Sequence, residues 1–567
     1  MAYGYRENEN HRVPKFVPTP NNKSLGYFDT PKGKVELDET IKILRLANKT
    51  TTHRPVVLAS LGPHVENACY PHVDPSDQAT AMAGSMYRFG RKITIQKDLT
   101  EFKAFVNDWL KKNMSPLNNV DTSFETWIAQ TPYTLARKDQ LREKHSKLPP
   151  GYKIDRKFLK ISAFIKDEIA VDYKHARAIN SRSDEYKCKV GPIFNLISKE
   201  LFKQDWFIKK IPINERPKYI IDRLMRIGSV FRTTDYTSFE AHFTGHLKQN
   251  CEFQLYEYMT NHLSEGKDWM ELVRKGGLTE DNQIHFKTFS MSINSKRMSG
   301  EMDTSLGNGF SNLMLMLYIC HKNGNKDISG VVEGDDGLFV MTGAPPAQKM
   351  FDNFGLVIKI LDFEELNHAS FCGLVFDLDD KTNVTDPIAA LVEFGWTTAR
   401  YARSNDRIHK HLIRAKALSL AYQYPSCPIL SKMAYKMCQL TAGYDSAAFL
   451  KKQGTHAFCQ YELEVLNEAE AYFKKNGLLN EPRIGTRQLV SKLYGIEIAD
   501  QITIEKYIEE LTEIVPLSHP LINIYVSEHC HTYYDKYALK LPYKHDNDNR
   551  LSVWPGIRPA AKFVRRI

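Results

Sequence analysis

Two adjacent carboxylates, Asp335 and Asp336, stand between two short apolar runs of the sequence. The stretch 331–340, Val-Val-Glu-Gly-Asp-Asp-Gly-Leu-Phe-Val, is typical of a β-hairpin with an acidic turn at its tip. Gly334 and Gly337 permit backbone angles that a residue with a Cβ resists. Carboxylates on such a rigid turn suit Mg²⁺ or Mn²⁺, which prefer oxygen ligands. Gly and Asp are also ordinary residues of solvated turns, so the tripeptide Gly-Asp-Asp alone does not decide between the two interpretations.

A third carboxylate, Asp235, follows a separate strand-like run. The run 228–235 is β-prone, and after Asp235 a polar turn leads into a long helical pattern. An acid presented at the end of a strand is a natural metal ligand. Asp is equally common as a helix cap or turn residue. By itself, Asp235 fits both interpretations.

Three cations accompany two further strand-like stretches, 161–168 and the region around Ile179 within 177–182. Lys166, Arg177 and Arg182 belong to this predicted strand–loop–strand unit. Such a unit lines basic groups along one channel, where they neutralise a triphosphate. A surface hairpin with solvated charges is the alternative.

Small polar residues precede and open a long, mainly apolar helical pattern. Ser299-Gly300 is typical of a flexible loop. Thr304 and Asn308 are four residues apart, so they share one face of a helix. Their hydroxyl and amide groups are able to hydrogen-bond a sugar hydroxyl. A capped helix start with incidental polar residues explains the same pattern.

Two later strands carry the remaining candidates. Residues 355–360 are strand-like and contain Lys359, which is either a proton donor or a solvated surface lysine. The stretch 371–376, Phe-Cys-Gly-Leu-Val-Phe, is a second apolar strand.

The elements that must position these groups differ along the chain. Residues 1 to about 90 are punctuated by prolines near the start, which predicts an extended arm rather than a helix. A helix is expected to begin at Asp98. From about residue 385 the pattern is helical and predicts a bundle. The helical segments expected there are 406–423, 428–442, 461–476, 486–494 and 503–515.

Composition limits the class of protein. The 567 residues carry a formal net charge of +10, which fits a polyanionic partner without requiring one. Nine cysteines are scattered without any Cys-x-x-Cys pair, which argues for a reducing compartment and against a structural zinc site. The sequence contains no apolar run long enough to span a bilayer.

Taken in order, these signals resemble the motifs of the RNA-dependent RNA polymerases of positive-strand RNA viruses, most of all the tombusvirus-like group and its relatives. The stretch 299–308, Ser-Gly-Glu-Met-Asp-Thr-Ser-Leu-Gly-Asn, is the most specific match and resembles motif B. The other resemblances are Lys166-Asp167-Glu168 with Arg177 to Arg182 for motif F, Asp235 to His242 for motif A, Gly334 to Asp336 for motif C, Lys359 for motif D and Phe371 to Gly373 for motif E. The resemblance covers about residues 160–376.

The resemblance implies an α+β fold shaped like a right hand, with an antiparallel palm sheet and a helical thumb. The implied parts are an N-terminal extension over 1–90 that packs on fingers or thumb, fingers over 91–230 with motif F at 161–182, a palm over 231–380 with a fingers insertion at about 245–292, and a helical thumb with a basic tail over 381–567.

The implied activity is template-directed RNA synthesis that replicates a viral RNA genome. An RNA 3′-hydroxyl attacks the α-phosphate of an incoming NTP at two Mg²⁺ ions, for which Mn²⁺ can substitute. Asp235, Asp335 and Asp336 would hold the ions. The RNA template, the product strand and NTPs are the implied partners. Other viral replication proteins would supply membrane association in the host cytoplasm.

The resemblance gives roles to the remaining residues in the same way. The triphosphate would be bound by Lys166, Arg177 and Arg182, the ribose by Glu240, Ser299, Thr304 and Asn308, and the primer strand by Phe371, Cys372 and Gly373. Lys359 would donate a proton to the pyrophosphate. Glu240 stands where the family usually has Asp, so its carboxylate reaches one methylene further.

Two other functions stay open from the sequence. A reverse transcriptase shares the same palm, but those enzymes tend to carry an aromatic residue where Glu333 stands. A basic RNA-binding scaffold without activity would be expected to have lost acidic residues, and all of them are present. A capsid protein is the least favoured, because no jelly-roll run of strands is visible.

Overall fold

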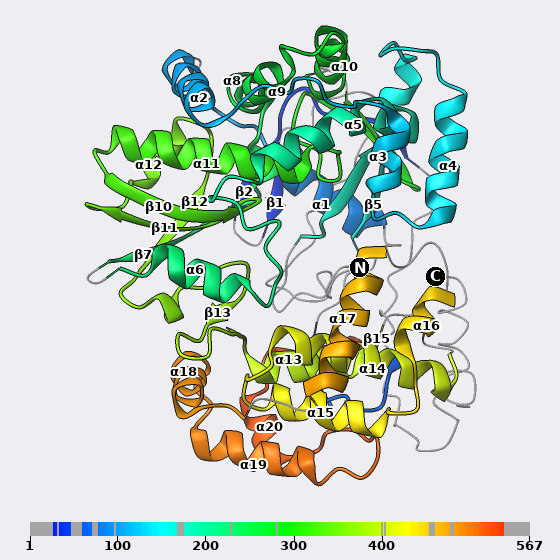
Figure 1. Cartoon of the computed structure of the whole chain (residues 1–567), viewed down its shortest axis with the longest axis vertical. Coiled ribbons are helices and arrows are strands. Elements are labelled where there is room, and N and C mark those ends of the chain that lie inside the picture. Colours follow the sequence, from blue (N-terminus) through cyan, green and yellow to red (C-terminus); the bar gives the residue numbers. More distant parts are fainter. Residues whose placement is uncertain are drawn as a thin grey trace.

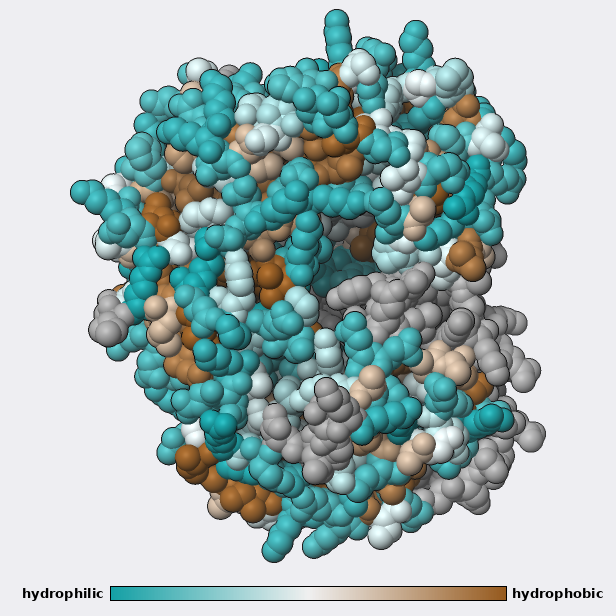
Figure 2. All heavy atoms as spheres, viewed as in Figure 1, coloured by the Kyte–Doolittle hydropathy of each residue, from teal (hydrophilic) through white to brown (hydrophobic). Residues whose placement is uncertain are grey.

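The computed structural model describes residues 27–30, 33–46, 59–70, 78–95, 98–166, 175–226, 229–278, 282–397, 401, 404–452, 460–476 and 481–537. Asp167, Glu168 and the basic tail 558–567 lie outside these residues. In Figure 1 the described elements form two bodies, an upper one with the larger sheets and a lower one of helices. The space-filling view from the same side is largely hydrophilic and is hollowed near its centre, where the two bodies meet (Figure 2).

A four-stranded antiparallel sheet forms one centre of the upper body. Its spatial order is β10-β11-β7-β12. The strands are β7 (Phe231–Tyr236), β10 (Lys326–Glu333), β11 (Asp336–Thr342) and β12 (Ile358–Phe363). The predicted hairpin is therefore present as β10 and β11.

Both faces of this sheet are covered, which explains the nearly continuous apolar runs of its central strands. Val332 packs into a core with helix α11 (Thr304–Lys322), whereas its neighbour Val331 packs into a second core with helix α6 (Arg216–Leu224). Figure 1 shows these two helices on opposite sides of the sheet. The acidic turn thus projects from a hairpin that is buried on both faces.

A second sheet of five strands has the order β3-β9-β8-β5-β6. Its strands are β3 (Lys42–Leu46), β5 (Ile161–Ile165), β6 (Ala178–Arg182), β8 (Asn282–His285) and β9 (Phe289–Ile293). The strand-like stretches predicted within 161–168 and around Ile179 are present as β5 and β6, which pair with each other antiparallel. Alternate residues of β5 are buried and exposed, as expected for a sheet with one covered face.

Helix α1 (Gln78–Phe89) covers that face and corrects the expectation of an arm without helix over residues 1–90. Its sequence is rich in small residues, and Gly84 lies so close to the Ala176 backbone that a Cβ there would be 2.3 Å from the carbonyl oxygen. Close packing of small residues leaves little apolar periodicity for sequence analysis to detect.

Several helices surround α11 and complete the upper body. They are α2 (Thr100–Asn113), α3 (Phe124–Gln130), α4 (Leu135–Ser146), α5 (Asp184–Leu201), α7 (Phe239–His242), α8 (Gly245–Asn250), α9 (Glu252–Thr260), α10 (Gly266–Gly277) and α12 (Gln348–Asp352). The helix expected at Asp98 begins two residues later, after Asp98 accepts a hydrogen bond from the Thr100 backbone.

The lower body is helical, as the apolar stripes predict. Its helices are α13 (Pro387–Phe394), α14 (Asp406–Gln423), α15 (Leu430–Leu440), α16 (Ser446–Lys452), α17 (Gln460–Asn476), α18 (Ile484–Tyr494), α19 (Ile498–Glu509), α20 (Pro520–Tyr525) and α21 (Glu528–Tyr537). Only the segment expected at 503–515 is displaced, by about one turn toward the N-terminus. Most of these helices contribute to one apolar core.

The N-terminal segment contacts both bodies. In the upper body, β3 pairs with β9. In the lower body, β4 (Ala59–Ser60) pairs with β15 (Trp396–Thr397). The remaining short strands are β1 (Tyr27–Thr30), β2 (Gly33–Glu36), β13 (Val375–Phe376) and β14 (Asn383–Val384). Among the described helices, none combines the length and the apolar character that crossing a bilayer requires.

Candidate active site

The acidic turn consists of Gly334 and Asp335, between the paired residues Glu333 and Asp336. Gly334 has a φ of +62°, which a residue with a Cβ rarely adopts. A glycine at the first position of a two-residue turn matches the twist of the two strands. The sequence therefore fixes both the place and the shape of this turn.

Strand β7 brings Asp235 to the same end of the sheet. Thr234 pairs with Gly337, so the next position along β7 lies beside Asp336. On its other side Asp235 pairs with Lys359 of β12, whose side chain is exposed. Three acids and one lysine from separate parts of the sequence thus lie together at one end of the four-stranded sheet.

Their charges are poorly compensated in the protein alone. Burial raises the pKa of Asp335 most, and with the neighbouring carboxylates of Glu240, Asp336 and Asp235 it brings that pKa to about 7. Burial and then Asp235 also raise the pKa of Asp336. Such raised pKa values are typical of functional sites, and a cation would relieve the repulsion.

This donor set is suited to a hard divalent cation, because it offers carboxylate oxygens on rigid strands. Within the part of the chain that the structure describes, no three His, Cys, Asp or Glu side chains are already arranged to hold an ion. The register and the pKa values show that the acids are neighbours, and closure around an ion requires side-chain rotation.

Asn312 holds the acidic turn through hydrogen bonds to its backbone. The role of this residue was not predicted from the sequence. Its side-chain amide lies on α11 and donates to the carbonyl oxygens of Gly334, at 3.2 Å, and of Asp336, at 3.1 Å. The available signal was spacing, since Asn312 follows Thr304 and Asn308 at intervals of four on one helix face.

The three residues predicted to hold the primer strand lie beside the turn but differ in exposure. Cys372 has a φ of +54° and hydrogen-bonds the Asp336 carboxylate. Gly373, with a φ of +76°, lies in the same tight turn. The side chain of Phe371 is buried in the core with Val331, so it supports the turn from within instead of facing a strand.

A small pocket of about 60 Å³ collects several predicted residues from different elements. Lys166 and Arg177 line it together with Glu240 and Ser299. Two of the predicted triphosphate ligands therefore lie with two of the predicted ribose ligands. Arg88, at the end of α1, also lines this pocket, although no chemistry was predicted for that part of the sequence.

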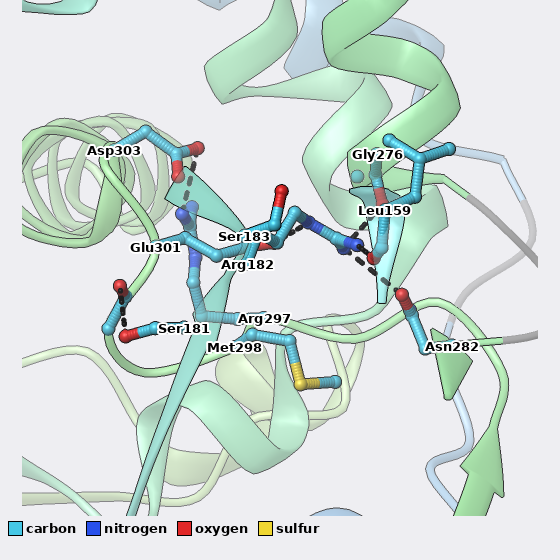
Figure 3. Close-up of polar contacts among 12 residues, drawn as sticks. Leu159, Ser181, Arg182, Ser183, Gly276, Asn282, Arg297, Met298, Glu301 and Asp303 are labelled. Atoms are coloured by element: carbon cyan, nitrogen blue, oxygen red, sulfur yellow. Dashed lines mark hydrogen bonds and ion pairs between the residues drawn. The ribbon is translucent and has the colours of Figure 1, made fainter. Parts of the chain in front are cut away.

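Arg182 corrects the expectation that three cations line one channel. Its side chain is only 3% exposed and pairs with Glu301, with 2.5 Å between Nε and Oε1 (Figure 3). Its other N–H groups donate to the carbonyl oxygens of Leu159 and Gly276 and to Asn282. Strand alternation turns Arg182 toward the interior, and its donors are used within the protein.

Thr304 and Asn308 share a face of α11, as predicted, but their side chains differ in their hydrogen bonds. The Thr304 hydroxyl accepts from the Gly300 backbone at 3.2 Å and donates to the Glu301 carbonyl at 2.9 Å, so it shapes the loop. Asn308 is 4% exposed, and its Oδ1 has no hydrogen-bond partner among the described residues. A buried amide oxygen without a partner is costly, which makes Asn308 a candidate ligand-binding group.

Comparison with known proteins defines the class of the protein. Residues 250–358 match the family model of viral RNA-dependent RNA polymerases. The matched range holds α11 and the acidic hairpin, whereas Asp235 and the β5–β6 pair lie before it. No curated protein matches the chain.

The chain therefore carries a viral RNA-dependent RNA polymerase domain. The enzyme is an RNA-directed RNA polymerase, a nucleotidyltransferase of viral replication. This result favours the polymerase over the reverse transcriptase and the inactive scaffold that the sequence had left open.

Proposed function

We propose that this enzyme replicates a viral RNA genome by transferring nucleotides from NTPs to an RNA 3′-hydroxyl under the direction of an RNA template. The observation that carries the proposal is that Asp235 lies close to Asp335 and Asp336 at one end of the four-stranded sheet. Paired carboxylates from two rigid strands are what in-line phosphoryl transfer with metal ions requires.

Asp235, Asp335 and Asp336 would hold two Mg²⁺ ions, or Mn²⁺ in their place. When bound, such ions stabilise charge on the attacking and leaving oxygens. The raised pKa of Asp335 supports this assignment, because burial and the neighbouring carboxylates disfavour its charged form and a bound cation would favour it. Cys372 and Asn312 orient Asp336 and the turn.

Lys166 and Arg177 would bind the triphosphate in the pocket that also holds Ser299 and Glu240. Their charges oppose those of the phosphates, so they position the α-phosphate for attack. Asn308, with Ser299 and Glu240, would recognise the 2′-hydroxyl that separates ribonucleotides from deoxynucleotides. Thr304 contributes through the loop that it shapes.

Lys359 would donate a proton to the leaving pyrophosphate. Its exposed side chain lies on the strand next to Asp235, which supports a place at the edge of the site. Cys372 and Gly373 would steady the primer strand beside the acidic turn.

The right-hand description supplies the division of the chain. We assign the four-stranded sheet to a palm over 231–380, with an insertion into the fingers at about 245–292. Fingers would occupy 91–230, a helical thumb 381–567 and an N-terminal extension 1–90. The tombusvirus-like group remains the proposed relationship. The long helical lower body and the two contacts of the N-terminal segment support this division.

RNA template and product are the expected macromolecular partners, held by basic surfaces that track phosphates without reading sequence. We place the enzyme in the host cytoplasm, at membrane-associated replication sites. Other viral replication proteins would bring it there.

An extension assay tests the proposal. Purified full-length protein is given unprimed and primed RNA templates, the four NTPs and Mg²⁺, and the products are resolved by length. The expected result is complementary RNA whose sequence follows the template and whose synthesis stops when Mg²⁺ is chelated. Products that form without a template, or that form equally well with the Asp335→Ala variant, would overturn it.

A further inference from the structure

Three consecutive residues of β6 bind three consecutive residues of the loop that precedes α11. The Asn180 backbone N–H donates to the Ser299 carbonyl at 2.5 Å, and the Ser181 hydroxyl donates to the Gly300 carbonyl at 3.3 Å. The third contact joins Arg182 to Glu301. Figure 3 shows Ser181 and Arg182 of the strand beside Glu301 of the loop. The loop thus behaves as a short addition to the edge of the five-stranded sheet.

The third contact is a buried ion pair. The side chains of Arg182 and Glu301 are 3% and 6% exposed, and Nε and Oε1 are 2.5 Å apart. Removing one charge from such a pair leaves the other buried without compensation, which is strongly unfavourable. Arg182 is also fixed by Leu159, Gly276 and Asn282, so it presents a rigid anchor for Glu301.

The loop backbone has little freedom where it crosses β6. Gly300 has a φ of +107°, and a Cβ there would lie 2.9 Å from the Ile179 side chain and 3.2 Å from the Asn180 nitrogen. Glycine is required both for the angle and for the close approach. The backbone carbonyl of Ser299 is held at one side of this crossing, and its residue lines the pocket.

A second buried cluster holds the end of the loop nearest α11. Arg297, which is fully buried, pairs with Asp303 at 3.1 Å and also contacts Glu252. The Tyr256 hydroxyl donates to Asp303 at 3.0 Å. The loop is therefore held at Asp303 by Arg297 and Tyr256 and at Glu301 by Arg182 of β6. Glu301 is the side chain that ties it to the sheet carrying Lys166 and Arg177.

We propose that the Arg182–Glu301 pair is a positioning pair that sets how strictly the polymerase selects ribonucleotides. The same strand pair, β5 and β6, leads into the two pocket cations, and the pair fixes Ser299 relative to them. Sugar selection depends on where the ribose lies when the triphosphate is held, so a displaced loop weakens discrimination without removing any group that contacts the nucleotide. This inference rests on the proposed role of Ser299 and Asn308 at the ribose.

The test uses single-nucleotide addition by the full-length enzyme on a primed RNA template. The kcat/KM for an NTP and for the matching 2′-deoxy-NTP are measured with wild-type protein and with Glu301→Gln, which keeps the shape of the side chain and removes its charge. The expected result is a ratio of the two values that falls about tenfold, mainly through a higher KM for the NTP.

A matched control separates this effect from general destabilisation. Glu505→Gln breaks the Arg487–Glu505 pair, which is similarly buried and joins α18 to α19 in the lower body. The control is expected to lower the melting temperature and to leave the ribo-to-deoxy ratio unchanged. An unchanged ratio in Glu301→Gln, or an equal fall in the control, would overturn the proposal.

Two further variants keep the proposal testable and separate it from the proposed function. Should Glu301→Gln not fold, Arg182→Lys retains the charge but loses the planar donor, and a ratio that stays at the wild-type value in that variant overturns the proposal. Ser299→Ala tests the ribose assignment itself. If Ser299→Ala changes the ratio and Glu301→Gln does not, the positioning pair fails and the proposed function stands. If Glu301→Gln changes it and Ser299→Ala does not, Ser299 loses its assigned role, and the proposal that the pair acts by positioning Ser299 is overturned.

Discussion

Asn312 of α11 donates its side-chain amide to the backbone carbonyl of Asp336, at 3.1 Å, and thereby joins the helix to the acidic turn. A second hydrogen bond, to the carbonyl oxygen of Gly334, means that Asn312 binds the backbone on both sides of Asp335. Because the turn positions Asp335 and Asp336, the geometry of the metal site depends on a residue that touches neither carboxylate.

Asn312→Ala should therefore raise the Mg²⁺ concentration needed for half-maximal synthesis. Loss of two hydrogen bonds should also lower the free energy of unfolding by about 1–3 kcal/mol. Activity titrated with Mg²⁺, alongside urea unfolding, measures both quantities. Asn323→Ala is the control, because Asn323 ends the same helix and bonds to Asn325 and Ala344, away from the turn. Equal Mg²⁺ requirements in the two variants would contradict the role of Asn312 in positioning the acidic turn.

Asp335→Ala should abolish nucleotide addition while leaving the fold and RNA binding largely intact. Its carboxylate is a proposed metal ligand, and its uncharged replacement relieves repulsion instead of creating it. Extension assays, circular dichroism and an RNA-binding titration give the three readouts. Asp108→Ala removes an exposed acid on α2 and should be fully active. Normal synthesis by folded Asp335→Ala protein would remove the residue from the site.

Metal binding should depend on pH through Asp335. Its pKa of about 7 means that an ion must displace a proton below neutrality. The apparent affinity for Mn²⁺ should then weaken by about tenfold for each pH unit below 7 and level off above it. Isothermal titration calorimetry in buffers of different ionisation enthalpy measures the released proton. Asp335→Asn should bind more weakly and show a flatter profile. A wild-type profile that is flat from pH 5.5 to 7 would contradict a raised pKa.

The raised pKa of Asp335 also predicts how the free energy of unfolding of the metal-free protein depends on pH. The pKa of Asp335 is higher in the folded chain than its ordinary value of 3.8, so the folded state binds the extra proton. Its contribution to stability is full below about pH 4 and is lost as pH rises through about 7. Thermal unfolding of wild-type protein and of Asp335→Asn between pH 5 and 8 should diverge toward higher pH, with the variant more stable. Saturating Mg²⁺ should reduce the difference, because it stabilises the charged carboxylate.

Asn308→Ala should narrow the preference for ribonucleotides over deoxynucleotides. The amide oxygen of Asn308 is buried and lacks a partner in the described chain, as expected of a group that waits for a ligand hydroxyl. Competition between an NTP and the matching deoxy-NTP in one reaction measures the ratio directly. A ratio equal to that of wild type would deny Asn308 its sugar role.

Local patterns were sufficient to predict the elements that carry the chemistry. The hairpin around Asp335 follows from alternation and a glycine turn, and α11 follows from a long apolar period. The pairing of β5 with β6 could also be expected, because the stretch 161–168 and the region around Ile179 are short and alternate. Which strand lies beside β11 depends on contacts distant in the sequence, and only the resemblance to a family suggested β7.

The direction of individual side chains was harder to predict. Arg182 looked like its basic neighbours, yet its position in β6 turns it inward to Glu301. Phe371 is buried, which its sequence neighbourhood did not predict. The spacing of Asn312 places it on the helix face of Asn308, but its bonds to backbone groups of the turn could not be predicted from that spacing. Helix α1 was missed because small residues pack closely without an apolar stripe. Alternation determines which residues share a face, but the partner of that face comes from the tertiary fold.

The two strand pairings of the N-terminal segment also bear on how the chain keeps itself from aggregating. β3 closes one edge of the five-stranded sheet by covering β9, a strand whose five residues are all buried, and β4 covers β15. Removal of the first 60 residues would bare both of these edges. An exposed, apolar strand edge is a template for pairing with another chain. Forms of this polymerase that lack the first 60 residues should therefore aggregate. By covering these strand edges, the N-terminal segment protects the chain from such aggregation.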